Sequence, residues 1–139
     1  MKTLLFSLMG VLFFVNAFAQ TKKMDQEKKL KEKIALACIL TDKDQIKRMN
    51  ELHQTIFKKA DKALEHANSY ELLFNKPDSS LNKELFEFIH FEQLCCPWLK
   101  FQVSFEPGNG PVSLKLGNSA QTKEMANLVM QLDKLRAAR

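Results

Sequence analysis

The chain has 139 residues, 45% of them hydrophobic and 27% charged, and a formal net charge of +5. This length accommodates one domain with a substantial core and argues against a second domain. The basic excess does not indicate nucleic-acid binding, because the lysines between Thr21 and Lys33 are mixed with acidic residues and have no aromatic neighbours.

The first segment, MKTLLFSLMGVLFFVNAFAQ, is typical of a secretory signal peptide. Lys2 precedes an apolar run that falls short of the roughly 20 residues needed to span a bilayer. Ala17-Phe18-Ala19 before Gln20 matches a small-x-small cleavage pattern. We therefore expect residues 1–19 to be removed on export, which predicts a periplasmic or secreted protein without stable membrane insertion. A retained N-terminal anchor is the alternative.

The mature chain is expected to begin with a polar, lysine-rich tether over residues 20–33, TKKMDQEKKLKEK with its preceding Gln20. Residues 34–139 are expected to form a single α+β domain. The apolar run IALACIL, Ile34 to Leu40, has the length of a strand buried on both faces, with Cys38 on the same face as Ile34.

A long helix is predicted after this strand. Thr41 and Asp44 give a T-x-x-D start that is close to a capping box. Apolar residues then recur at spacings of three and four as far as Leu64. His53 lies within this stripe, where a lone histidine is more often a core residue with a hydrogen-bond partner than a ligand.

The rest of the chain alternates between strand and helix patterns. SYELLFNKP predicts a strand that places Tyr70, Leu72 and Phe74 on one face, and Asp78-Ser79-Ser80 caps a helix from Leu81 to Cys95. FQVSF and VSLKL, joined by the turn PGNG, predict a hairpin. Asn118 or Ser119 caps a last helix, whose predicted apolar side comprises Met125, Leu128, Val129 and Leu132.

These elements give the order β-α-β-α-β-β-α. Because the hairpin strands alternate in polarity, one face of the sheet is expected to be solvated. The predicted fold is therefore a two-layer α+β sandwich, in which a four-stranded mixed sheet carries the helices on one face.

The stretch FEQLCCPWLKF contains the residues that suggest chemistry. A residue before proline avoids helical dihedrals, so Pro97 predicts that the helix ends at Cys96 and that Cys95 lies in its last turn. Glu92 is three and four residues before the two thiols, within reach of either. A carboxylate on the apolar side of a helix is costly unless it is paired or functional. The alternative is that the Glu92 side chain bends outward to meet a lysine such as Lys100.

The predicted position of the two thiols favours cation binding over nucleophilic attack. Cys95 and Cys96 lie at the C-terminal end of the predicted helix, where the helix dipole is negative and favours the neutral thiol. A nearby carboxylate favours the neutral thiol as well. A soft cation compensates the thiolate directly, and thiolates select Cu(I), Zn(II) and Hg(II). The candidate metal ligands are Cys38, Cys95, Cys96 and Glu92. His90 is a poorer candidate because it points to another side of the helix from the thiols. His66 is poorer because it is expected to lie at the surface.

Two other functions stay open. The chain could be a protein-interaction module with structural cysteines, in which case the tether and an exposed Trp98 are the expected contact surfaces. It could also be a thiol-dependent reductase or organometal lyase, with Cys95 or Cys96 attacking and Glu92 moving the proton. A vicinal disulfide would be strained and would close almost no loop. No catalytic residue, other cofactor or particular protein partner is assigned.

The stretches ALACIL and FEQLCCPWLKFQVSFEPGNGPVSLKLGNSAQTKE resemble a widespread, uncharacterised family of small bacterial proteins. Its pattern reads A-C-T-L near the start, then E-x-x-C-C-P-F-L-x-F, an acidic-Gly-Gly-Pro turn, and an L-x-L-T-G-P-x-G-x-K-E-F end. The residues that match it are Cys38, Glu92, Cys95, Cys96, Pro97, Phe101, Gly110, Pro111, Lys123 and Glu124. Leu40, Trp98 and the segment GNSAQTKE depart from it. The resemblance implies a constellation of three cysteines and names no substrate.

Overall fold

The structure is a computed structural model that describes residues 21, 23–34 and 39–137. Residue 21 and residues 23–34 are helical. The following elements are α2 (Lys43–Lys59), β1 (Lys62–Glu65), β2 (Tyr70–Phe74), α3 (Leu81–Cys95), β3 (Phe101–Phe105), β4 (Val112–Leu116), α4 (Ala120–Met130) and α5 (Leu132–Ala137). The predicted signal peptide lies outside the described residues. Among the helices that are described, none combines the length and apolar character needed to cross a membrane.

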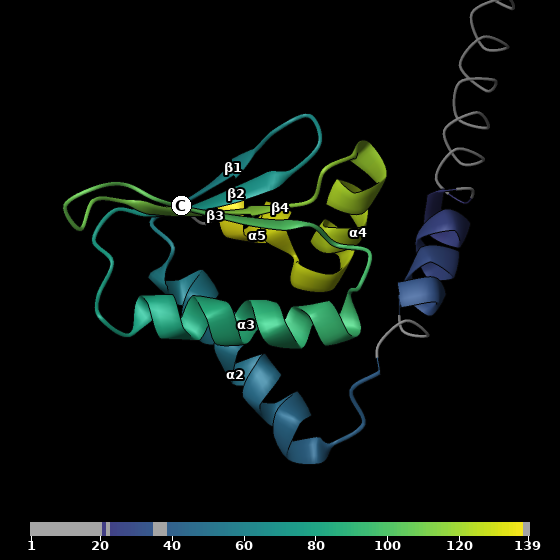
Figure 1. The fold of residues 1–139 in the computed structure, drawn as a ribbon. Coiled ribbons are helices and arrows are strands. Elements are labelled where there is room, and N and C mark those ends of the chain that lie inside the picture. Colours follow the sequence, from purple (N-terminus) through teal and green to yellow (C-terminus); the bar gives the residue numbers. More distant parts are fainter. Residues whose placement is uncertain (1–20, 22, 35–38, 138–139) are drawn as a thin grey trace, which may run out of the picture.

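The four strands form one sheet in the order β1-β2-β4-β3, and every neighbouring pair is antiparallel. The predicted α+β class and the four-stranded sheet are confirmed, whereas the predicted mixed sheet is wrong. Figure 1 shows α3 lying along the sheet as a second layer, with α2 crossing α3. Tyr70, Leu72 and Phe74 of β2 are buried, and Val112, Leu114 and Leu116 of β4 lie beside them.

The fourth strand is not the one predicted. Ile34 is helical, Leu40 is irregular, and residues 35–38, including Cys38, lie outside the described residues. The fourth strand is instead β1, Lys62–Glu65, a segment that the predicted long helix included as far as Leu64. Helix α2 ends at Lys59 because Ala60 turns to extended dihedrals, and β1 then pairs with β2. The predicted order β-α-β-α-β-β-α is therefore wrong, and the described order is helix, helix, β, β, helix, β, β, helix, helix.

Local capping groups set the helix boundaries. Asp42, not Thr41, caps α2 and accepts a hydrogen bond of 2.9 Å from the Gln45 N–H. Ser119 caps α4 through a capping box with Thr122. The last predicted helix is in fact two helices, because Gln131 adopts a left-handed conformation with φ of 54°.

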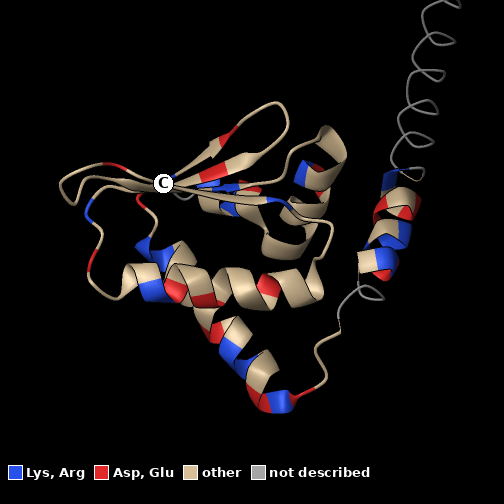
Figure 2. Cartoon of the chain, viewed as in Figure 1, with Lys and Arg blue, Asp and Glu red and all other residues tan. Residues whose placement is uncertain are grey.

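The core lies between the sheet and the helices. Phe88 of α3 is fully buried and makes edge-on contacts with Phe57 of α2 and Phe101 of β3. At the helix surface, Arg48 forms a bidentate ion pair with Glu87, at 2.8 and 2.7 Å, that joins α2 to α3. Figure 2 shows acidic and basic residues interspersed along the N-terminal helix, so its described residues are not uniformly basic.

Candidate thiol site at the end of helix α3

The two adjacent cysteines lie where α3 ends, as the proline predicted. Cys95 is the last helical residue, and Cys96 leaves the helix with φ of −126° and ψ of 61°. The Cys96 carbonyl then accepts a hydrogen bond of 2.9 Å from Leu99, which closes a turn over Pro97 and Trp98. Cys95 is 7% exposed and Cys96 is 1% exposed. Both cysteines are therefore buried in the core at the point where α3 ends.

Glu92 is buried one turn before the cysteines, with 1% exposure. Its Oε1 atom forms a short hydrogen bond with Nε2 of His53, which comes from α2. Its Oε2 atom is buried and has no hydrogen-bond partner within the described part of the chain. The alternative in which Glu92 bends outward to Lys100 is therefore wrong, because this carboxylate turns inward to α2.

His53 has the role of a partly buried core residue with a polar partner. Its ring lies 5.5 Å from the Phe57 ring and 5.3 Å from the Phe88 ring, measured between centroids. Two aromatic neighbours and the carboxylate fix its position between α2 and α3. The sequence placed His53 and Glu92 on apolar helix faces separately, and their contact across 39 positions was not predicted.

The Cys96 thiol is held in its neutral form. Burial raises the pKa of this thiol far above its usual range, and the charge of Glu92 and a hydrogen bond with the Glu92 side chain raise it further. This direction agrees with the expectation from the helix end. A nucleophilic thiol needs a depressed pKa, so Cys96 has the opposite of the electrostatics required for attack near neutral pH.

Cys95 and Cys96 differ in their chemical state. Cys96 is a free cysteine, whereas Cys95 is disulfide-bonded. The third predicted sulfur ligand, Cys38, lies outside the described residues. The next residue, Ile39, donates a backbone hydrogen bond of 3.2 Å to the Leu94 carbonyl. This bond holds the chain that follows residues 35–38 against the last turn of α3.

The described residues contain no cluster of three or more histidine, cysteine, aspartate or glutamate side chains placed to hold a metal ion. They do bring Cys96 and Glu92 together, and His53 hydrogen-bonds to the same carboxylate. The predicted set of four ligands is thus neither assembled nor excluded, because Cys38 is one of its members. A complete metal site would need that residue or a rearrangement of the others.

The remaining histidines are separate from this site. His66 follows β1, is exposed, and hydrogen-bonds to Glu71 at 2.7 Å. The His90 ring lies 5.8 Å from the ring of its neighbour Phe91. Trp98 is partly buried against the core, and its Nε1 is buried with no partner among the described residues. The expectation of an exposed Trp98 is therefore wrong.

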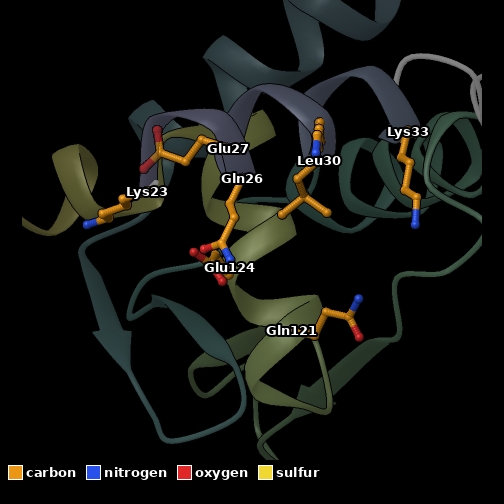
Figure 3. A pocket seen from close by; sticks show the side chains of 8 residues that line it. Lys23, Gln26, Glu27, Leu30, Lys33, Gln121 and Glu124 are labelled. Atoms are coloured by element: carbon orange, nitrogen blue, oxygen red, sulfur yellow. The ribbon is translucent and has the colours of Figure 1, made fainter. Parts of the chain in front are cut away.

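A cavity of about 350 Å³ lies between the N-terminal helix and α4. Figure 3 shows its charged lining, with Lys23, Glu27 and Lys33 on the helix and Gln121 and Glu124 on α4. Both signs of charge contribute to this lining, and no residue of the thiol site does.

Comparisons with known proteins give no family assignment. A scan against families of known proteins, a search of curated proteins and a search of solved structures each found no match. The resemblance noted from the sequence stays a prediction.

Proposed function

We propose that this chain is an exported thiol protein that binds a soft metal ion when its cysteines are reduced. The ligands are Cys38, Cys95, Cys96 and Glu92, and Cu(I), Zn(II) and Hg(II) are the candidate ions. The supporting observation is the pairing of a buried free thiol at Cys96 with a buried carboxylate, Glu92, that keeps one oxygen without a hydrogen-bond partner among the described residues.

The electrostatics of the pair favour a cation over a free thiolate. Ionisation of the Cys96 thiol would place a thiolate beside the Glu92 carboxylate in the core, and burial, followed by the charge of Glu92, raises the pKa of Cys96. A bound cation would offset both charges and replace the thiol proton. His53 would act as a positioning residue, because its hydrogen bond holds Glu92 in the orientation that leaves Oε2 available.

The test is a titration of the reduced mature protein with Cu(I), Zn(II) and Hg(II), followed by binding and by proton release. We expect one ion to bind with release of the Cys96 proton, and Cys96→Ser to weaken binding at least about tenfold. His66→Gln serves as a control, because it removes an exposed histidine outside the site. The proposal fails if no ion binds more tightly to the chain than to the variant in which all three cysteines are serine.

The second candidate is an interaction module whose cysteines stabilise the fold. The disulfide bond of Cys95 favours it, because a disulfide restricts the unfolded chain and suits an oxidising compartment. It predicts that reduction lowers stability and creates no metal affinity. The third candidate, a thiol reductase or organometal lyase, is disfavoured by the raised pKa of Cys96.

The proposed export is tested separately. The intact mass of the exported protein shows whether residues 1–19 are removed.

A further inference from the structure

Strand β3 forms an open edge of the sheet. Among the described strands it pairs with β4 on one side and with none on the other. Its sequence, FQVSF, contains no charged residue and no proline. The opposite edge strand, β1, carries Lys62 and Glu65, which are residues that discourage edge-to-edge pairing. The two edges of the sheet are therefore protected to different degrees.

The hydrogen bonds to β4 show which backbone groups of β3 point outward. Gly117 donates to the Lys100 carbonyl at 2.9 Å, and Glu106 donates to the Pro111 carbonyl at 3.1 Å. In antiparallel pairing the bonding direction alternates along a strand. Even-numbered residues of β3 thus face β4, and the N–H and C=O groups of Phe101, Val103 and Phe105 face the open edge.

An exposed apolar patch, formed by Phe86 and Phe105, lies beside this edge. Phe105 is 48% exposed, and the neighbouring Phe86 of α3 is 59% exposed. Their rings stack, with centroids 6.5 Å apart and planes inclined by 25°. Phe101 and Val103 are only partly buried against the core. The open backbone groups and the exposed aromatic surface therefore occupy the same border of the molecule.

We propose that this border pairs with a second copy of the chain, β3 against β3, to form a two-fold dimer with a continuous sheet. Antiparallel pairing centred on Val103 places Phe101 opposite Phe105 of the second copy. All three outward-facing residues of each strand then exchange hydrogen bonds. The strand is nearly symmetric about its centre, as a two-fold interface requires, because Phe flanks Val103 at two positions on both sides.

Charge complementarity selects the same partner and the same register. Lys100 precedes β3 and Glu106 follows it, each three positions from Val103, and both are exposed. Centring on Val103 therefore places Lys100 opposite Glu106 of the second copy, and the two-fold axis repeats the pair. Opposite charges across antiparallel strands are favourable and like charges are unfavourable. An unrelated extended peptide would have no reason to carry this pattern.

The first test is the oligomeric state of the mature protein by sedimentation across micromolar to millimolar concentrations. We expect a reversible dimer. Val103→Pro removes an outward-facing N–H and leaves the bonds to β4, so it should abolish the dimer while the monomer stays folded. Val103→Thr keeps that N–H and should keep the dimer. A monomer at all concentrations, or a dimer insensitive to Val103→Pro, overturns the proposal.

The second test reverses the charges. Lys100→Glu or Glu106→Lys alone places like charges opposite each other, and each should raise the dimer dissociation constant roughly tenfold. The double variant Lys100→Glu with Glu106→Lys restores opposite charges and should recover the original affinity. Additive weakening in the double variant would exclude this register. Capture of an extended peptide by a chain that stays monomeric would assign the edge to a peptide and reject self-association.

Discussion

His53 on α2 and Glu92 on α3 join the two helices through a hydrogen bond between Nε2 and Oε1 in the interior of the domain. Glu92 is 1% exposed and the side chain of His53 is 18% exposed. Removing one member leaves the other buried without its partner, which is more costly than removing both. The pair therefore stabilises the packing of α2 on α3 only when both residues are present.

We predict that Glu92→Ala lowers the free energy of unfolding by about 3 kcal/mol, because it leaves a cavity and an unpartnered His53. Replacing both residues, His53→Phe with Glu92→Leu, should recover most of this loss. Urea denaturation of the metal-free protein measures both changes. Glu92→Gln keeps the shape of the side chain and is the matched control. Equal losses in the single and double variants would show that the hydrogen bond contributes little.

The second prediction concerns pH and Cys96. Burial, followed by the nearby Glu92 charge, raises the pKa of the folded-state thiol above its ordinary value of 9.0. Because the neutral form is favoured in the folded state, the associated stability is complete below pH 9. It is lost progressively as the pH rises above that value. Cys96→Ala should therefore flatten the alkaline decline in the free energy of unfolding.

Thiol alkylation provides an independent measurement of the same property. Near neutral pH the native protein should react at Cys96 far more slowly than the unfolded chain, because the thiol is buried and un-ionised. Rapid alkylation of native Cys96 would contradict the raised pKa. It would also revive the thiol-enzyme hypothesis.

The elements predicted correctly are those whose pattern is local. The hairpin of β3 and β4 was found because its strands alternate strictly around the turn PGNG. The end of α3 was found because Pro97 restricts the residue before it. Each of these signals depends on only a few neighbouring residues.

The errors arise where a local pattern fits two structures. Leu64 continues the helical spacing of α2, yet it belongs to β1, because pairing with β2 determines the conformation there. The apolar run that begins at Ile34 predicts a strand but fits a segment of a buried helix equally well, and Ile34 is helical. The contact of His53 with Glu92 depends on how α2 packs on α3, and no spacing within either helix specifies it.

A glycine after β4 provides the third prediction. Gly117 has φ of 95°, and an added Cβ would lie 3.1 Å from the Asn68 carbonyl oxygen and 3.3 Å from the Lys123 nitrogen. Gly117→Ala should therefore lower the free energy of unfolding by about 2 kcal/mol or more. Gly108→Ala is the control, since its φ is 67° but nothing lies within 4 Å. It should cost only about 1 kcal/mol. Equal costs would mean that the crowding at Gly117 is relieved by movement.

The last prediction contrasts two phenylalanines on α3. Phe88 is 0% exposed and contacts Phe57 and Phe101, so Phe88→Ala should lower the free energy of unfolding by about 4 kcal/mol through lost burial and a cavity. Phe86 is 59% exposed, so Phe86→Ala should change monomer stability by less than about 0.5 kcal/mol. The same variant should weaken the proposed dimer, because it removes half of the stacked pair with Phe105. Denaturation at low protein concentration and sedimentation at high concentration separate the two effects. If Phe86→Ala destabilised the monomer as much as Phe88→Ala, the Phe86 side chain would belong to the core and the exposed apolar patch would not exist.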